Sequence, residues 1–312
     1  MMSSAVLWTD VAPRDGLQNV SATIPTDAKM RLVRGLLDAG VPRVEATAFV
    51  SPKWVPQLAD AAALLDALGD DALPRLRVLI PNSRGLELAL ERSVRNVLVT
   101  IGVTETFNRR NVNRTVAESL ADLGGIVEVA HANGCSVDVA LSVAFGCPFE
   151  GRVAPDRVSD MCARVADAGV DEVGIADTIG VATPAAVTHL CQLMSAVVPA
   201  ERMSLHVHDT RGIGVANVVT AYQSGVRRFD GSVGGVGGCP FAPRSTGNVC
   251  SEDALLALTS LGATTTANLA ALCDVASALE RDLGQPLPGR LYRAGVWTGT
   301  QVVDDAAERR VG

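Results

Sequence analysis

The sequence has few aromatic residues and no excess of positive charge. Aromatic side chains make up 4% of its 312 residues, and 27 Lys and Arg stand against 34 Asp and Glu, which gives a net charge of −7 and a pI near 5.2. Such a chain has no global positive field that could hold phosphate backbones or an anionic membrane surface. We therefore expect neither a nucleic-acid partner nor a membrane partner.

Long apolar runs are also missing. Runs such as Ala61 to Leu65 are far shorter than the roughly 20 residues that a membrane-spanning helix needs. Residues Met1 to Asp10 lack the basic start and the long apolar stretch of a signal peptide. These two absences predict a cytoplasmic protein.

Cysteine is present without close paired spacing. Its seven copies are an odd number, so neither a disulfide framework nor a CxxC zinc site is favoured. With 48% apolar and 20% charged residues, the composition is that of a globular protein of enzyme size. A disordered chain, a collagen-like repeat and a small disulfide scaffold are excluded.

Apolar runs that end in polar or glycine residues predict eight strands. They are Val6 to Ala12, Arg43 to Phe49, Arg77 to Pro81, Asn96 to Val103, Ser136 to Ala144, Glu172 to Ala176, Ser204 to Val207 and Arg228 to Val233. Patterns of helical period lie between them. The predicted helices cover Thr26 to Ala39, Pro56 to Leu68, Ser83 to Arg92, a helix opened by Thr115 with Glu118 in capping-box spacing, Pro155 to Ala168, Pro184 to Val198, Val215 to Ser224 and Glu252 to Leu261.

Strands and helices that alternate about every 30 residues are typical of repeated right-handed βαβ units. Eight such units without a long linker favour a closed (β/α)8 TIM barrel over an open sheet, and one domain over residues 1–312 over two smaller ones. A further helix, Ala267 to Leu283, and the Pro/Gly-containing segment Gln285 to Gly289 follow the eighth unit. We expect residues 267–312 to form a helical appendage that packs against the barrel.

The barrel prediction places the active site where the strands end. Strand one runs into Pro13 to Asn19, which brings Arg14 and Asp15 directly after an apolar strand, and strand seven ends in His206-Val207-His208. The period-2 alternation of a strand directs both imidazoles to the same side, where they could share a metal ion, although two histidines that bind nothing remain the alternative. Closure of the ring would bring them beside Asp15 and Asn248.

A carboxylate, two imidazoles and an amide oxygen form a mixed oxygen and nitrogen ligand set. Such a set suits Mg²⁺ or Mn²⁺, and Zn²⁺ stays open because imidazole also suits zinc. A redox role is disfavoured, since the set contains no thiolate.

Other polar residues follow the predicted strands. Glu45 lies within strand two, Asp177 follows strand six and Glu105 follows strand four. The glycine-rich segment Gly234 to Phe241 carries the thiol of Cys239, and phosphate binding is a weaker alternative for this segment because it follows the last strand rather than the first. A second Gly-Cys-Pro-Phe at 146–149 means that spacing alone does not single out one thiol.

Six segments together resemble the 3-hydroxy-3-methylglutaryl-CoA lyase family of metal-dependent lyase and synthase barrels. They are residues 13–19 (PRDGLQN), 49–57 (FVSPKWVPQ), 146–151 (GCPFEG), 177–181 (DTIGV), 206–210 (HVHDT) and 237–242 (GGCPFA). The related isopropylmalate and homocitrate synthases share the Arg-Asp-Gly start and the paired histidines but lack the Gly-Gly-Cys-Pro signature. The resemblance therefore favours cleavage of a carbon–carbon bond over condensation.

The resemblance implies a divalent cation and a set of functional side chains. The implied metal ligands are Asp15, His206, His208 and Asn248, and the implied catalytic residues are Arg14, Glu45, Asp177, His206 and Cys239. The implied reaction is cleavage of a 3-hydroxyacyl-CoA into acetyl-CoA and a ketoacid or ketone. In that reaction Arg14 would stabilise the enolate, His206 or Asp177 would move the hydroxyl proton, and Cys239 would protonate the acetyl-CoA carbon.

Four positions depart from the family pattern. Arg211 replaces an aromatic residue, Ala48 a serine, Val20 an acid and Arg114 a cysteine. The ligands and the acid–base groups are unchanged. A variant acyl group, longer or differently branched, is one interpretation, and a surface role for Arg211 is the other.

The remaining expectations concern partners. Residues Asn108, Arg109, Arg110 and Asn111 lie in a segment expected to be a polar, basic loop that binds the nucleotide phosphates of CoA. The family resemblance implies a homodimer or a higher homo-oligomer. Two other functions stay open: a condensing acyltransferase on the same barrel, and a non-catalytic protein that binds metal or acyl-CoA. Intact Arg14 and Cys239 argue against the second, because binding alone needs neither.

Overall fold

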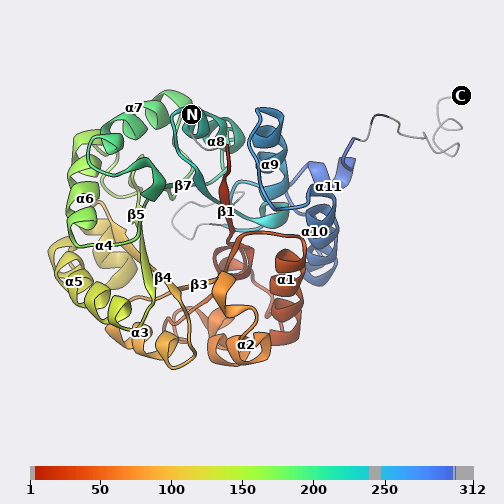
Figure 1. Ribbon diagram of the computed structural model, residues 1–312, viewed down its shortest axis with the longest axis horizontal. Helices are drawn as coiled ribbons and strands as arrows, with labels where there is room; N and C mark the ends of the chain where they lie inside the picture. The colour runs from red at the N-terminus through yellow and green to blue at the C-terminus, as the bar shows by residue number, and fades with distance from the viewer. Residues whose placement is uncertain (1–3, 239–246, 298, 300–312) are drawn as a thin grey trace, which may run out of the picture.

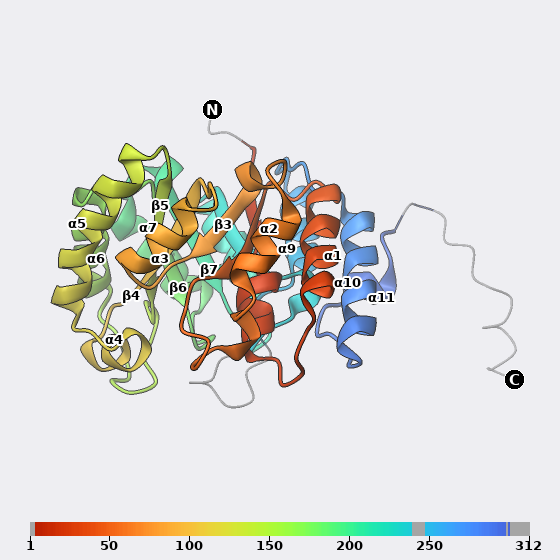
Figure 2. The same cartoon turned by 90° about the horizontal axis from the view of Figure 1, so that it is seen from below.

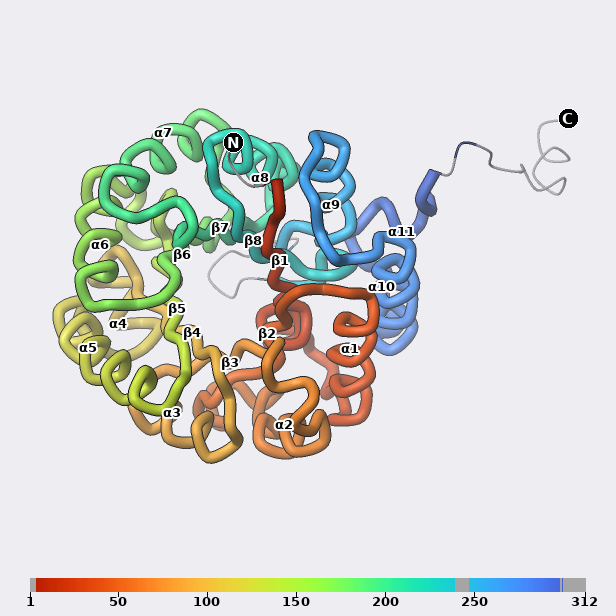
Figure 3. Tube along the Cα trace, viewed as in Figure 1, coloured from red at the N-terminus to blue at the C-terminus, as the bar shows by residue number. Residues whose placement is uncertain are grey.

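The computed structural model describes residues 4–238, 247–297 and 299. In this part of the chain, eight parallel strands form a closed barrel in sequence order, and β1 pairs with both β2 and β8 (Figures 1 and 3). The strands are β1 Leu7–Asp10, β2 Arg43–Ala48, β3 Leu76–Leu79, β4 Asn96–Gly102, β5 Ser136–Ser142, β6 Glu172–Asp177, β7 Met203–Val207 and β8 Arg228–Gly231. The predicted (β/α)8 barrel is confirmed, and each strand lies where its apolar run predicted it.

Helices surround the strands on the outside (Figure 1). They are α1 Thr26–Asp38, α2 Ala61–Leu68, α3 Ser83–Leu90, α4 Glu105–Val112, α5 Val116–Ala132, α6 Pro155–Asp167, α7 Pro184–Ser195, α8 Gly214–Gln223, α9 Ser251–Ser260, α10 Leu269–Leu283 and α11 Leu291–Ala294. The capping box predicted at Thr115 is present: its hydroxyl accepts from the Glu118 N–H, and the Glu118 carboxylate accepts from the Thr115 N–H. A 3-10 turn at Pro56–Leu58 followed by the eight-residue helix α2 replaces the single helix predicted for Pro56 to Leu68.

Two helices were not predicted. α4 covers the segment that was expected to be a loop, and α11 follows the Pro/Gly-containing segment. α10 packs against α1 and α9, at the place in the ring where β1 meets β8 (Figure 1). The chain after the eighth unit therefore covers this junction of the barrel wall.

The interior of the barrel is charged. Such interiors are usually filled by branched apolar side chains, but here ionisable residues point inward from β2, β3, β5, β6 and β8. They are Arg43, Glu45, Arg77, Asp138, Glu172 and Asp230. Because buried charges are costly unless paired, each of these groups has an oppositely charged neighbour.

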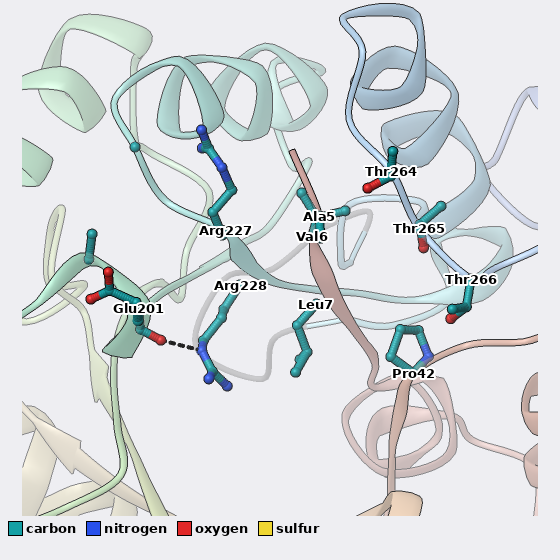
Figure 4. Close-up of a pocket in the computed structure, with 12 residues that line it drawn as sticks. Ala5, Val6, Leu7, Pro42, Glu201, Arg227, Arg228, Thr264, Thr265 and Thr266 are labelled. Carbon is teal, nitrogen blue, oxygen red and sulfur yellow. Dashed lines mark hydrogen bonds between the residues drawn. The ribbon is translucent and has the colours of Figure 1, made fainter. Parts of the chain in front are cut away.

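A hollow of about 630 Å³ lies at the amino-terminal ends of β1, β2 and β8 (Figure 4). Apolar and threonine side chains form most of its wall, together with Glu201, Arg227 and Arg228. The guanidinium of Arg228 donates to the backbone carbonyl of Glu201. Active sites of this fold lie at the opposite, carboxyl-terminal ends of the strands, so we do not assign this hollow to the active site.

No helix in the described part of the chain has both the length and the apolar composition of a membrane span.

Candidate active site

The turn after β1 places Arg14 and Asp15 at the carboxyl-terminal end of the barrel. The backbone N–H groups of Arg14, Asp15 and Gly16 all approach the carbonyl oxygen of Val11, at 3.2, 2.8 and 3.1 Å, so the chain turns tightly over Ala12–Gly16. Arg14 and Asp15 are each only 8% exposed. A tight turn directly after an apolar strand therefore buries a cation and a carboxylate side by side.

Asp15 meets both histidines of β7. Its Oδ2 atom lies 4.0 Å from Nε2 of His206 and 3.6 Å from Nε2 of His208. One potential ligand atom from each of these three residues lies within 4.8 Å of the others. The three-residue grouping predicted from barrel closure is thus present in the structure.

Asn248 joins this cluster because its segment runs beside the end of β7. His208 and Asn248 form an antiparallel bridge, and the flanking backbone bonds run from Asp209 to Gly247 and from Val249 to Val207. Nδ2 of Asn248 donates to Oδ2 of Asp15 at 2.9 Å.

The donor atoms of this cluster fit a divalent cation. Among the described residues, Oδ1 of Asn248 and Nδ1 of His208 have no hydrogen-bond partner, although both side chains are buried. Buried polar atoms are rarely left without a partner unless a ligand, ion or water completes them. An amide oxygen, an imidazole pair and a carboxylate are ligands that Mg²⁺, Mn²⁺ and Zn²⁺ accept in different proportions.

The charge of Asp15 is held by its neighbours. Burial alone would raise the pKa of Asp15, but the guanidinium of Arg14 and the two imidazoles lower this pKa well below its ordinary value of 3.8. Nη1 of Arg14 donates to Oδ1 of Asp15 at 2.7 Å, and Nε2 of Gln18 donates to the same oxygen at 2.8 Å. Asp15 is therefore a carboxylate, as a metal ligand must be.

Glu45 fixes Arg14 from the other side. Nε of Arg14 donates to Oε1 of Glu45, which is fully buried in β2. The acid predicted at this position thus lies next to Arg14, and the guanidinium is held between two carboxylates.

Asp230 is a site residue that the sequence reasoning missed. It lies in β8, is 7% exposed, and its Oδ2 atom is 3.5 Å from Nδ1 of His206. Histidines that bind metals usually donate their other ring N–H to such an acceptor, which sets the orientation of the ring. Its position two residues after Arg228 and shortly before the glycine-rich segment gave no motif that could have identified it.

Asp177 has a structural environment. Its two carboxylate oxygens accept the backbone N–H groups of Val181 and Ala182, both at 2.8 Å, and only 1% of the residue is exposed. Burial raises the pKa of Asp177, and these two hydrogen bonds partly offset that effect. In the structure, Asp177 therefore holds the loop after β6.

The glycine-rich segment after β8 lies against the turn after β1. The Nδ2 atom of Asn19 donates to the carbonyl of Gly238 at 2.9 Å, and a Cβ atom on Gly16 would come within 2.7 Å of Val236. The residue that follows Gly238 is Cys239, which lies outside the described residues.

The four residues predicted to bind CoA lie on α4 rather than in a loop. Asn108 is fully buried: its Oδ1 accepts the Gly102 N–H, and its Nδ2 donates to the Arg114 carbonyl and to Ser119. The expectation that Asn108 contacts nucleotide phosphates is therefore wrong, because its polar atoms hold α4 against β4 and α5. The other three, Arg109, Arg110 and Asn111, are exposed.

α4 follows β4, so it lies at the same end of the barrel as the Asp15 cluster, opposite the amino-terminal end (Figure 2). Arg110 stacks over the ring of Phe149, with 4.3 Å between the guanidinium carbon and the ring centre.

The four departures from the family pattern have local packing roles. Arg211 donates to the carbonyls of Ile179 and Gly180, and so joins the loops after β6 and β7. Arg114 pairs with Asp122 of α5. Ala48 packs in an apolar cluster with Leu58, Leu79 and Leu98. The side chain of Val20 packs, partly buried, against the main hydrophobic core.

Comparison with known proteins shows the family of this chain. A family model described as HMGL-like matches residues 5–279. The chain belongs to the HMGL-like family. Among curated relatives of this family member, the (R)-citramalyl-CoA lyase of Chloroflexus aurantiacus is 40% identical over 301 residues, which cover 93% of this chain and 95% of the relative. The hydroxymethylglutaryl-CoA lyase YngG of Bacillus subtilis is 39% identical over 281 residues, which cover 90% and 94% of the two chains.

Solved structures of HMGL-like proteins share the same barrel. An HMG-CoA lyase from Acinetobacter baumannii, in complex with coenzyme A and 3-methylmalate, superposes with a TM-score of 0.91 at 34% identity and covers 97% of this chain and 99% of that one. The HMG-CoA lyase of Bacillus subtilis gives a TM-score of 0.90 at 38% identity, with 94% and 98% coverage.

Proposed function

We propose that this protein is a divalent-metal-dependent carbon–carbon lyase that cleaves a 3-hydroxy-3-methylglutaryl-CoA-like thioester into acetyl-CoA and a ketoacid or ketone. The observation that carries the proposal is the meeting of Asp15, His206 and His208 next to Arg14 at the carboxyl-terminal end of the barrel. Family membership supports it, since the two curated relatives described above are both named as acyl-CoA lyases.

Asp15, His206, His208 and Asn248 would hold the cation, and Mg²⁺ or Mn²⁺ suits the mixed ligand set best. When bound, such an ion acidifies and orients the substrate hydroxyl as a Lewis acid. We therefore include Mg²⁺ or Mn²⁺ in the proposal. Zinc is the alternative, and metal analysis of the purified protein would detect it.

The reaction breaks the bond between C2 and C3 of the acyl group. The hydroxyl on C3 loses its proton, C3 becomes a ketone, and the bonding electron pair moves to C2 to form the thioester enolate. Arg14 is placed to stabilise that enolate oxygen, because its charge is permanent and Glu45 and Asp15 fix its orientation.

Protons move at two atoms in this mechanism. We assign the hydroxyl proton to His206 or to Asp177. His206 can accept it only while its Nε2 atom, 4.0 Å from Asp15, is not bound to the cation, because its Nδ1 atom faces Asp230. Cys239 is the group that we assign to protonating C2 of the enolate, on the basis of the family resemblance. The hydrogen bond from Asn19 to Gly238 supports this assignment, since it holds the residue before Cys239 against the Arg14 turn.

The CoA part of the substrate would lie over α4. Arg109, Arg110 and Asn111 are exposed at the same end of the barrel as the ligand cluster, and two guanidinium groups suit nucleotide phosphates. The acyl group stays open between 3-hydroxy-3-methylglutaryl and a variant such as citramalyl, because both activities occur among the named relatives.

Mass-resolved turnover tests the proposal. The purified, Mn²⁺-loaded protein is incubated with 3-hydroxy-3-methylglutaryl-CoA, citramalyl-CoA and related 3-hydroxyacyl-CoAs, and separately with acetyl-CoA and a 2-oxoacid. We expect acetyl-CoA and a ketoacid from at least one thioester and no condensation product. Condensation without cleavage would instead identify an acyltransferase. Metal binding without turnover on the whole panel would identify a binding protein.

A further inference from the structure

Arg77 lies inside the barrel and pairs with the acids Glu45 and Asp230 rather than with Asp15. It belongs to β3, is only 1% exposed, and stands opposite Glu45 in the register of β2 and β3. Its Nε atom donates to Oε2 of Glu45 at 2.6 Å, and its Nη2 atom donates to Oδ2 of Asp230 at 2.7 Å. One guanidinium therefore joins two buried acids from strands that are not neighbours in the barrel.

Each of these two acids also contacts a residue of the candidate active site. Oε1 of Glu45 accepts from Arg14, while Oε2 accepts from Arg77. The same oxygen of Asp230 that accepts from Arg77 lies 3.5 Å from Nδ1 of His206. Arg77 is thus one residue removed from the enolate-stabilising cation and one residue removed from a metal ligand.

The charges explain what Arg77 contributes. Glu45 and Asp230 are both buried, so each carboxylate needs a nearby cation. Without Arg77, Arg14 and His206 would be the closest positively charged or proton-bearing partners left to these acids, and each would be drawn toward the barrel interior. The planar fork of arginine can hold two carboxylates at fixed positions, which the single ammonium of lysine cannot do.

Arg43 offers a matched comparison. It also lies inside the barrel, where it pairs with Asp138 at 2.8 Å and with Glu172 at 2.9 Å. Its hydrogen bonds run to Thr9, Asp138 and Glu172, and none of them reaches Glu45 or Asp230. Arg77 approaches Asp138 and Glu172 only at 3.8 Å. The two arginines therefore share a buried ion-pair network, but only Arg77 hydrogen-bonds the two acids that contact Arg14 and His206.

We propose that Arg77 is a positioning residue that fixes Arg14 through Glu45 and His206 through Asp230. For turnover this inference rests on the proposed function, whereas for metal binding it rests on the geometry of the ligand cluster.

Arg77→Met and Arg43→Met are compared with the unaltered protein. Two quantities are measured well below the unfolding temperature of each variant. One is turnover of the best thioester, and the other is the affinity for Mn²⁺ alone, which titration calorimetry gives. For Arg77→Met we expect kcat and Mn²⁺ affinity each to fall about 10- to 100-fold, with KM changed much less. For Arg43→Met we expect a similar loss of thermal stability but kcat and Mn²⁺ affinity within about threefold of the unaltered protein.

Arg77→Lys keeps the test decisive if Arg77→Met does not fold. Lysine retains the charge but can hold only one of the two acids firmly, so kcat or Mn²⁺ affinity should fall by about tenfold in a protein that loses less stability than Arg77→Met does. Unchanged kcat and Mn²⁺ affinity in a folded Arg77 variant would overturn the inference. Equal losses in Arg43→Met and Arg77→Met would also overturn it, because they would show a general effect of disturbing the core.

Failure of the proposed function gives a different pattern. If the unaltered protein cleaves no thioester, the lyase proposal fails, and the Mn²⁺ measurement alone decides the role of Arg77. If the unaltered protein is active and the Arg77 variants match it, only the positioning role fails.

Discussion

At the scale of single residues, the most informative side chain is Arg14, which lies between the carboxylates of Asp15 and Glu45. Replacing it with lysine keeps a positive charge but removes the planar donors that we propose stabilise the enolate. We expect kcat of Arg14→Lys to fall by about 100-fold or more, since loss of one oxyanion donor costs that much in other enzymes. Steady-state kinetics on the best thioester measures this. Binding of Mn²⁺ should stay close to that of the unaltered protein, and near-normal turnover would remove the enolate role of Arg14.

Glu252 gives a residue-scale prediction about pH. Burial raises the pKa of Glu252 from 4.5 to about 7, even though its carboxylate accepts the Gly234 N–H. The folded protein therefore keeps a proton that the unfolded chain releases between about pH 4.5 and pH 7. Folding stability consequently falls as pH rises through this window.

Glu252→Gln removes this titration. Between pH 5 and pH 8, we expect the free energy of unfolding to fall more in the unaltered protein than in Glu252→Gln, by about 2–3 kcal/mol. Denaturant unfolding at several pH values measures the difference. Parallel pH profiles for the two proteins would show that Glu252 is ionised at neutral pH in the folded state.

Sequence reasoning found the residues whose positions follow from topology. Asp15, His206, His208 and Asn248 were predictable as neighbours because a closed barrel brings the ends of strands one, seven and eight together. Arg77 and Asp230 were not predicted, because they belong to no motif and their partners come from strands far away in the chain. For Arg77 the one signal was a full charge in the middle of an apolar strand, whereas β8 around Asp230 is itself polar.

At the scale of elements, α4 shows where periodicity fails. The segment Glu105–Val112 is mostly polar, so it has no apolar stripe to indicate a helix. One buried amide, that of Asn108, holds it in place through Gly102, Arg114 and Ser119. Such tertiary contacts cannot be read from local sequence. The strands and the larger helices, in contrast, have clear apolar patterns and were placed within a few residues.

Two substitutions on α4 separate its inner and outer faces. Asn108→Ala leaves buried groups without partners, so we expect a loss of about 2–3 kcal/mol in the free energy of unfolding. Arg109→Ala changes an exposed cation and should leave stability unchanged, while raising KM for the CoA thioester several-fold without a change in kcat. Chemical denaturation and steady-state kinetics on both variants check this. Unchanged KM in Arg109→Ala and in the corresponding Arg110→Ala would remove the CoA assignment from α4.

At the scale of the whole molecule, the barrel supports chemistry at one end with a charged interior. The ion pairs of Arg43 and Arg77 connect β2, β3, β5, β6 and β8 beneath the ligand cluster. Burial raises the pKa of Asp138 within this network to about 6, while Arg43 and Arg77 keep the pKa of Glu172 low. The site is therefore built on buried electrostatic contacts as well as on backbone pairing.

Closure of the barrel brings Asp15, His206, His208 and Asn248 together. The X-ray absorption spectrum of the Mn²⁺-loaded protein tests most directly our proposal that these four residues bind the cation. We predict a mixed oxygen and nitrogen shell with the scattering pattern of two imidazoles, reduced to one imidazole in His208→Ala together with weaker Mn²⁺ binding. A spectrum without imidazole scattering, or one that His208→Ala leaves unchanged, would contradict the assignment of Asp15, His206, His208 and Asn248 as the metal ligands.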